Sequence, residues 1–124
     1  MRQLVSTKWA LVAAVAGASA VLLGAFGAHA LRGVLDAQGM ELWHTAVNYH
    51  AWHALALVLG LGLGQGRMGR VSARAFVLGI VLFSGSLYAL ALGAPRWCGA
   101  ITPLGGLAFV VGWLTLGWSL RQRD

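Results

Sequence analysis

The stretch LWHTAVNYHAWHALALVLGLGL, residues 42–63, decides the fold class of this chain. It runs for 22 residues without one Asp, Glu, Lys or Arg. A helix needs about 20 apolar residues to cross the roughly 30 Å of hydrocarbon in a bilayer. The stretch also lacks the apolar and polar alternation of a barrel strand. It therefore predicts a membrane-spanning helix, and its three histidines and one asparagine need an explanation.

Three further apolar runs flank this stretch. They are WALVAAVAGASAVLLGAFGAHA (9–30), AFVLGIVLFSGSLYALALG (75–93) and PLGGLAFVVGWLTLGWSL (103–120). Each is close to the length that a membrane-spanning helix requires. Within lipid the backbone must satisfy its own hydrogen bonds, and a helix does so without a neighbouring strand. We expect an all-α fold, in which residues 1–124 form a single integral membrane domain of four transmembrane helices.

The overall composition supports the bilayer as the solvent. Hydrophobic residues make up 59% of the chain and charged residues 10%, with a mean hydropathy of +0.75. A soluble domain usually has about 25% charged residues. The net charge of +6 and the pI of about 11.2 could suggest a nucleic acid partner. The basic residues, however, stand at the ends of the apolar runs and form no basic face with interleaved aromatics. We therefore expect the lipid bilayer, and not nucleic acid, as a partner.

The distribution of Lys and Arg predicts the orientation. Seven of the nine basic side chains fall on one side of the predicted bundle and two on the other. The larger group is Arg2, Lys8, Arg67, Arg70, Arg74, Arg121 and Arg123, and the smaller group is Arg32 and Arg96. Loops rich in Lys and Arg stay in the cytoplasm. We therefore expect a multi-pass protein of the bacterial inner membrane with both termini cytoplasmic.

The first run also has features of a cleavable signal peptide. Basic residues precede it, and its end, AHA (28–30), resembles a signal peptidase site. The apolar region of a signal peptide is about 7–15 residues long, which is shorter than this run. We therefore expect residues 1–30 to be retained as a membrane span, and cleavage is the alternative.

The polar residues around the central stretch form two stripes on one helix. A helix advances about 100° per residue, which places Glu41, His44 and Asn48 on one face. His50 and His53 fall on a different face. His53 lies about 16 Å along the helix from the start of the run, and hence near the middle of the bilayer. An ionisable side chain at that depth is costly unless it is paired, so both inner histidines need partners.

Candidate partners stand at matching depths on the neighbouring runs. The inner polar cluster comprises His50, His53, Ser84, Ser86 and Tyr88. The outer polar cluster comprises His29, Glu41, His44 and Asn48. Two interpretations of the inner polar cluster remain open. Its hydrogen bonds would fix the register of neighbouring helices, or its side chains would line a ligand pocket or a proton path, since intramembrane ionisable groups are commonly functional.

The same histidines do not predict a cofactor or a metal. His50 and His53 stand three residues apart on one helix, so they cannot ligate opposite faces of one haem iron. A third metal ligand is not evident nearby in the sequence. No Asp or Glu lies within an apolar run, no nucleophile motif is present, and the lone Cys98 cannot form a disulfide within the chain. We therefore expect no metal, no cofactor, no catalytic residues and no enzyme activity.

Helix ends and packing surfaces can also be predicted. The joints between the runs are residues 32–41, 64–74 and 94–102. Thr102 followed by Pro103 suits a helix start, with the hydroxyl as N-cap. Small residues recur every four positions in the first run, at Ala16, Ala20, Gly24 and Ala28. Such a ridge lets a neighbouring helix approach closely. It predicts packing within the chain or, alternatively, the seam of a homo-oligomer.

Several motifs resemble those of a known family. They are GAFGAHAL (24–31), TAVNYHAWHALAL (45–57), LFSGSLYALAL (82–92), ITPLGGLAF (101–109) and the pair Gly112 and Trp113. In this order, over nearly the whole chain, they are similar to the YgdD family of small bacterial inner-membrane proteins, domain of unknown function four-two-three. The family is similar to the animal transmembrane protein two-five-six. The resemblance implies a four-helix multi-pass protein and assigns no reaction.

The function expected from these observations is that of a non-enzymatic accessory or interaction protein of the membrane. Its partners would be other membrane proteins or a second copy of the chain. The alternative is the binding or transport of a small ligand, lipid, quinone or proton through the inner polar cluster. The two functions differ in what accompanies the purified protein, which is a stoichiometric complex in one case and a small molecule in the other.

Overall fold

A computed structural model describes residues 5–121 of the chain, and all of the regular elements in that range are helical. They are α1 (Thr7–His29), α2 (Ala37–Leu63), α3 (Gly66–Gly79), the π-helix η1 (Ile80–Ser84), α4 (Gly85–Ala91), the 3-10 helix η2 (Arg96–Ala100) and α5 (Thr102–Leu120). Four helical stretches are long and apolar enough to cross a membrane: Thr7–His29, Ala37–Leu63, Gly66–Ala91 and Arg96–Leu120. The predicted all-helical fold is confirmed for the described residues, and its four long apolar stretches match the four predicted runs.

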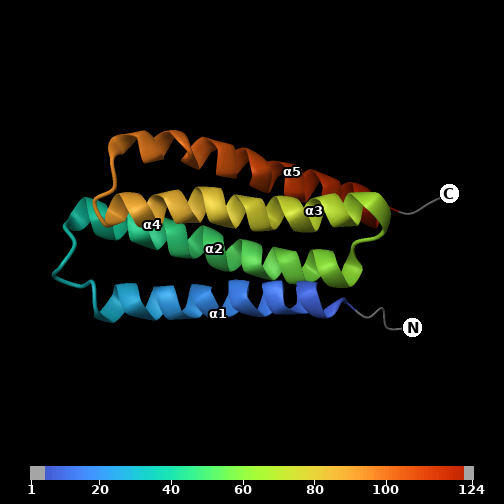
Figure 1. Cartoon of the computed structure of the whole chain (residues 1–124), viewed down its shortest axis with the longest axis horizontal. Helices are drawn as coiled ribbons and strands as arrows, with labels where there is room; N and C mark the ends of the chain where they lie inside the picture. Colours follow the sequence, from blue (N-terminus) through green and yellow to red (C-terminus); the bar gives the residue numbers. More distant parts are fainter. Residues whose placement is uncertain (1–4, 122–124) are drawn as a thin grey trace.

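The long helices lie side by side along one axis (Figure 1). α1 packs on α2 at one edge of the bundle, and α5 packs on α3 and η1 at the other edge. α2 lies between them and contacts α3, η1 and α4. The two ends of the described chain stand at the same end of the bundle. This arrangement surrounds the inner face of α2 with helices, which is where His50 and His53 lie.

Close packing of α5 against α3 and η1 depends on glycines that face phenylalanines. Phe76 of α3 lies against Gly112, and Phe109 of α5 lies against Gly79. Gly105 approaches the backbone of η1 so closely that a Cβ there would overlap it. Small residues let helix backbones come together in this way, and such packing holds helices together in lipid, where hydrophobic burial does not.

α1 uses part of the predicted ridge of small residues to pack on α2. Ala20 of the ridge is buried. Near the outer end Gly27, rather than the predicted Ala28, lies under the Trp43 ring. The Trp43 indole Nε1–H donates to the carbonyl of Leu23 at 2.9 Å. The ridge is therefore used within the chain, displaced by one residue at its end.

Two helix starts differ from the sequence prediction. Asp36 caps α2, since its Oδ1 accepts a backbone N–H three residues further on at 2.7 Å. α2 consequently begins earlier than expected, and the joint predicted at 32–41 is shorter. Thr102 is the first residue of α5 and not its N-cap, because its hydroxyl bonds to Ser86 instead. Pro103 stands in the first turn, as predicted.

The joint predicted at 64–74 is mostly helical. α3 begins at Gly66, whose φ of 63° turns the chain back toward the bundle. Arg67, Arg70 and Arg74 consequently stand on the first turns of a helix and not in a loop. The reason is that the residues of this segment separate into a polar and an apolar face, so the helix continues beyond the apolar run.

Candidate functional site

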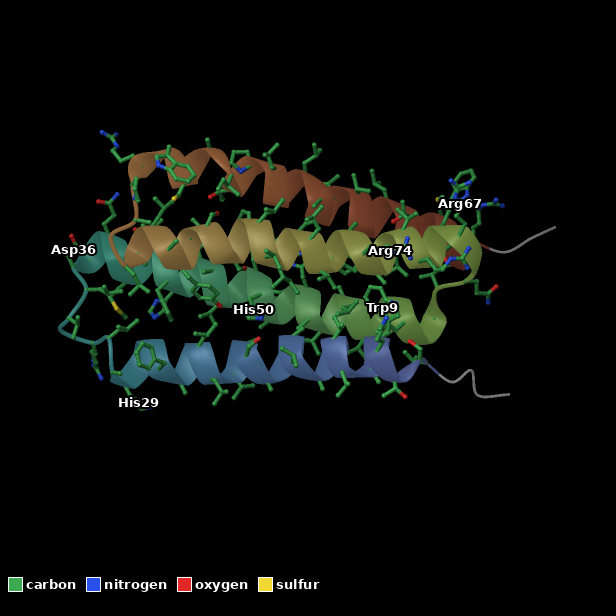
Figure 2. The ribbon with its side chains drawn as sticks, in the orientation of Figure 1. Trp9, His29, Asp36, His50, Arg67 and Arg74 are labelled. Atoms are coloured by element: carbon green, nitrogen blue, oxygen red, sulfur yellow. The ribbon has the colours of Figure 1, made fainter. Side chains whose placement is uncertain are left out.

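His50 joins three helices midway along the bundle (Figure 2). Its Nε2–H donates to the carbonyl of Ala16 on α1 at 3.0 Å, and the Ser19 hydroxyl of α1 lies 3.1 Å from the same nitrogen. Its Nδ1 accepts from the Tyr88 hydroxyl of α4 at 2.9 Å. Because a carbonyl oxygen only accepts, the contact with Ala16 assigns the ring proton to Nε2. His50 therefore connects both α1 and α4 to α2.

His53 connects α2 to α5. Its Nδ1–H donates to the carbonyl of Tyr49 in the preceding turn at 2.7 Å. Its Nε2 accepts from the indole Nε1–H of Trp113 at 3.0 Å. The imidazole also stacks on the Phe109 ring, with the two ring centroids 3.6 Å apart. These partners assign the proton of His53 to Nδ1, the opposite tautomer to that of His50.

The two histidines of the inner polar cluster thus have different partners. The expected contact of His50 with Tyr88 is present. The expected pairing of His53 with Ser84, Ser86 or Tyr88 is wrong, because Trp113 of α5 occupies that place. Three residues along a helix rotate the side chain by about 300°, which turns His53 away from α1 and toward α5.

The two serines of the cluster bond to other groups. The Ser84 hydroxyl donates to the carbonyl of Ala46 on α2 at 2.8 Å. The Ser86 hydroxyl contacts the carbonyl of Phe83 and the hydroxyl of Thr102. Ser84 is the last residue of the π-helix η1. A π-helical turn takes in an additional residue, so the side chains after it lie on faces that an uninterrupted α-helix would not give them.

The outer polar cluster is not brought together. His29, Glu41, His44 and Asn48 are all exposed, and no hydrogen bond joins any two of them in the described part of the chain. His44 and Asn48 stand on an outward face of α2, one turn apart. Trp52 follows one turn later and is 68% exposed. We call His44, Asn48 and Trp52 the outward stripe of α2.

A groove between α1 and the third span reaches His50. Its volume is about 400 Å³, within the range of about 300–1,000 Å³ that is typical of ligand pockets. Its walls are aliphatic and consist of Leu11, Val12 and Val15 on α1 and Val77, Ile80 and Val81 opposite. Ser19 and His50 supply the polar groups of its lining. We call this site the His50 groove.

The buried polar side chains of the bundle are satisfied by hydrogen bonds, and several of these bonds join two helices. Each buried side-chain nitrogen or oxygen within residues 5–121 has a hydrogen-bond partner. No group of three or more His, Cys, Asp and Glu side chains in that range could hold a metal ion. A relay of protons through His53 would end at Trp113, since an indole N–H only donates. This geometry supports cross-linking of helices as the role of the inner histidines.

The chain is similar to proteins from several bacteria. Residues 23–106 match the family described as "Protein of unknown function (DUF423)". The UPF0382 membrane protein YwdK of Bacillus subtilis is 43% identical over 110 residues, which cover 86% of this chain and 89% of the relative. The UPF0382 inner membrane protein YgdD of Escherichia coli K12 is 43% identical over 118 residues, covering 91% and 89%. The chain belongs to the DUF423 family, together with these relatives.

A third relative comes from Staphylococcus epidermidis. This UPF0382 membrane protein is 49% identical over 100 residues, which cover 78% of this chain and 81% of the relative. No solved structure matches the chain. The expected relationship to the YgdD family is confirmed, and the four apolar helices identify the chain as a membrane protein of that family.

Two partners of the buried histidines were not found from the sequence. Ser19 is the only hydroxyl side chain in residues 9–30, and a lone hydroxyl at mid-depth is a signal that could have identified it. Trp113 lies in the middle of its apolar run. Tryptophan usually sits at the membrane surface, so this position was a second signal.

Proposed function

We propose that this chain is a non-enzymatic accessory or interaction protein of the bacterial inner membrane, with both termini in the cytoplasm. The name of the YgdD relative supports the inner membrane. The basic side chains support the orientation. Arg67, Arg70 and Arg74 belong to the end of the bundle where both ends of the described chain lie, whereas Arg32 and Arg96 belong to the other end.

The outward stripe of α2 carries the interaction proposal. Asn48 is exposed, and its amide has no hydrogen-bond partner within the described residues. It lies about 9 Å along the helix axis from the predicted membrane edge at Leu42, and hence inside the hydrocarbon. An amide at that depth has no water to bond. A transmembrane segment of another protein, or of a second copy, would supply the missing hydrogen bond and cover Trp52.

The non-enzymatic part of the proposal follows from the inner polar cluster. Both ring nitrogens of His50 and of His53 are already bonded within the chain. Neither ring can act as a general base on a substrate without giving up a bond that holds two helices together. The nearest carboxylates, Asp36 and Glu41, stand at or beyond the start of the central run, away from both histidines.

The variant Asn48→Leu tests the interaction. We expect the wild-type protein, purified in a mild detergent, to carry a second copy or another membrane protein in stoichiometric amount by native mass spectrometry. We expect Asn48→Leu to lose that partner, because leucine cannot make the hydrogen bond. Its free energy of unfolding should change by no more than about 0.5 kcal/mol, as is usual for an exposed position.

The variant Leu107→Ala is the matched control. Leu107 is 61% exposed on α5 and is apolar, so it offers a partner no hydrogen bond. The control should keep the partner that Asn48→Leu loses. A wild-type protein without any partner, or a partner that remains in Asn48→Leu, would overturn the interaction proposal.

The His50 groove favours a second candidate function, the binding of a small apolar ligand such as a lipid or a quinone. The groove has aliphatic walls, and the Ser19 hydroxyl in its lining is already bonded to Ala16 and His50, so the groove suits an apolar molecule or an acyl chain. The variant Val15→Trp places a large ring on an exposed wall of the groove, and we expect it to remove a copurifying ligand. The control Leu22→Trp also changes an exposed residue of α1 and should keep the ligand. Retention of the ligand by Val15→Trp would show that the ligand binds outside the His50 groove.

A further inference from the structure

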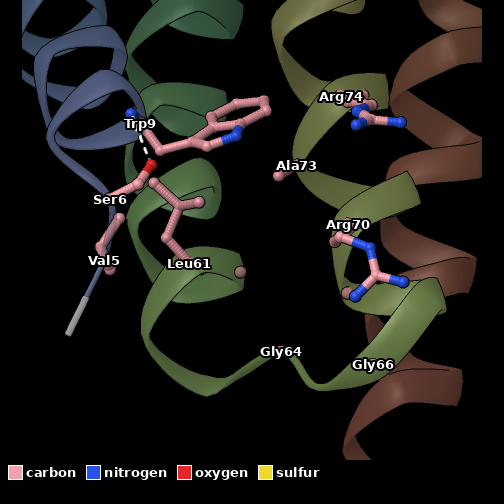
Figure 3. Close-up of a pocket in the computed structure, with 11 residues that line it drawn as sticks. Val5, Ser6, Trp9, Leu61, Gly64, Gly66, Arg70, Ala73 and Arg74 are labelled. Atoms are coloured by element: carbon pink, nitrogen blue, oxygen red, sulfur yellow. Dashed lines mark hydrogen bonds between the residues drawn. The ribbon is translucent and has the colours of Figure 1, made fainter. Parts of the chain in front are cut away.

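A second hollow lies between α1 and α3 at the end of the bundle that carries both chain ends (Figure 3). Its volume is about 260 Å³. Trp9 of α1 and Leu61 of α2 give it an apolar wall, and Arg70 and Arg74 stand on α3 across from Trp9. The remaining lining includes Gly60, Gly64, Gly66 and Gly69. Gly64 and Gly69 lie in close contact, since a Cβ on Gly69 would come within 2.8 Å of the Gly64 backbone. We call this site the basic hollow.

The charge of the basic hollow is not neutralised by the described carboxylates. Arg70 and Arg74 are one helical turn apart and therefore share a face of α3. Both are exposed. Asp36 and Glu41 are the acidic side chains within residues 5–121, and they belong to the opposite end of the bundle, where Figure 2 shows Asp36. Two guanidinium groups that no described carboxylate neutralises therefore stand beside a hollow with an apolar wall.

The His50 groove begins about one turn further along the same two helices. Trp9 lines the basic hollow, and Val12 and Val15 line the groove at the following helical positions. From Trp9 to Ser19 the helix advances about 15 Å, which is half of the roughly 30 Å hydrocarbon thickness. The basic hollow and the groove thus follow one another in the direction in which a lipid headgroup and its acyl chain are arranged in one leaflet.

We propose that this face of the protein binds one anionic phospholipid. Its phosphate lies between Arg70 and Arg74, and one acyl chain follows the groove toward Ser19. Guanidinium groups bind phosphate oxygens through paired hydrogen bonds, and basic pockets between transmembrane helices bind anionic headgroups. The apolar groove selects a lipid over a free anion. The assignment rests on the ligand groove proposed above and names the class of ligand.

The double variant Arg70→Gln with Arg74→Gln tests the headgroup. Delipidated full-length protein is titrated with phosphatidylglycerol or with phosphatidylcholine, and bound lipid is counted by native mass spectrometry. The wild-type protein should bind one phosphatidylglycerol in preference to phosphatidylcholine. The double variant should bind phosphatidylglycerol about thirtyfold more weakly, the change expected for two arginines at an anionic surface. Its weaker binding of phosphatidylcholine should not change.

The matched control is the double variant Arg67→Gln with Arg121→Gln. It removes the same charge from the same end of the bundle, but its two arginines line a different hollow, beside the end of α5. The control should bind phosphatidylglycerol as the wild type does. An equal loss in both double variants would mean that only the general positive charge attracts the lipid, and would overturn the site.

Inorganic phosphate separates a lipid headgroup from a free anion. Phosphate alone should neither bind nor compete with phosphatidylglycerol, and a phosphate adduct that depends on Arg70 and Arg74 would overturn the lipid assignment. The groove variant Val15→Trp separates this inference from the ligand groove. If Val15→Trp removes bound lipid while the double variant of Arg70 and Arg74 binds phosphatidylglycerol normally, the headgroup site is contradicted and the ligand groove is supported. If the wild-type protein binds no lipid of any kind, both fail.

Discussion

At the scale of the residue, His50 and His53 show how imidazoles can be placed inside a bilayer. Each ring donates from one nitrogen and accepts at the other, and the two rings carry their protons on opposite nitrogens. Water is not present in the hydrocarbon to replace a missing partner. The two histidines consequently hold different helices, with α1 and α4 on His50 and α5 on His53.

The hydrogen bond between His53 and Trp113 can be measured by a double-mutant cycle. We expect His53→Leu and Trp113→Phe to show a coupling free energy of about 0.6–1.7 kcal/mol in thermal unfolding in detergent, the range found for hydrogen bonds between membrane helices. The control cycle pairs His53→Leu with Ser86→Ala, which do not touch, and its coupling should be near zero. A coupling with Ser86 that exceeds the coupling with Trp113 would contradict the structure.

The engagement of all four ring nitrogens also predicts the metal content. A haem iron or a zinc ion binds a histidine through an unprotonated ring nitrogen, and in both residues that nitrogen already accepts from Tyr88 or Trp113. We expect the purified protein to show no Soret absorption and no stoichiometric iron or zinc by elemental analysis. A Soret band that disappears in His50→Ala would show that His50 ligates a haem.

The sequence identified which polar residues are buried better than it identified their partners. The 100° advance per residue separated His50 and His53 from Asn48 correctly. It could not reveal that His53 meets Trp113, because the partner depends on which helix lies beside that face of α2. The π-helix η1 adds a second difficulty, since its additional residue shifts the phase of every later side chain in the span.

At the scale of the element, the helix pairs differ in how closely they approach. α5 lies against α3 and η1 through the glycines that receive Phe76, Phe109 and the η1 backbone. α1, in contrast, packs on α2 and leaves the basic hollow and the His50 groove between itself and α3. The interface of α5 with α3 and η1 is therefore a part of the bundle where an added methyl group should be costly.

Adjacent glycines of α5 provide a matched test of that close interface. A Cβ at Gly105 would overlap the Phe83 backbone nitrogen, so Gly105→Ala should lower the free energy of unfolding by about 1–3 kcal/mol. At Gly106 the nearest atom would be 3.8 Å away, an ordinary contact. Gly106→Ala should be neutral or should stabilise by up to about 1 kcal/mol through helix propensity. Thermal unfolding in detergent compares the two, and equal effects would contradict the packing.

The apolar runs predicted which helices exist but not where they begin. Hydropathy locates the part of a helix that lies in hydrocarbon, whereas the ends depend on caps and on polar turns outside it. α2 begins at its Asp36 cap, and α3 begins at Gly66, nine residues before the apolar run that starts at Ala75. A side-chain cap is visible in sequence only when the helix start is already suspected. The additional turns of α3 matter because they carry Arg70 and Arg74.

At the scale of the whole molecule, the bundle has two faces of different chemistry. The outward stripe of α2 presents the Asn48 amide, which bonds to no described residue, beside the exposed Trp52. The opening between α1 and α3 presents arginines at one end and an aliphatic groove beyond them. The first suits a helix of another protein, and the second suits a lipid. The two proposals therefore assign the partner and the anionic lipid to different surfaces of one small bundle.

Cysteine labelling in intact cells tests the orientation of the bundle. Cys98 is the only cysteine of the chain, and it lies at the end of the bundle opposite the chain ends, so it should react with a membrane-impermeant thiol reagent. In a Cys98→Ser background, Val34→Cys should also react, because Val34 is 71% exposed in the outer joint. Arg67→Cys should react only after the cells are permeabilised, because the excess of Lys and Arg predicts that this end lies in the cytoplasm. The mass of the intact protein should include residues 1–30. Their removal would delete α1 and leave three spans in place of four. Labelling of Arg67→Cys alone in intact cells would show that the orientation is inverted. A measured mass that lacks residues 1–30 would show a three-span protein in which His50 has lost its partners on α1.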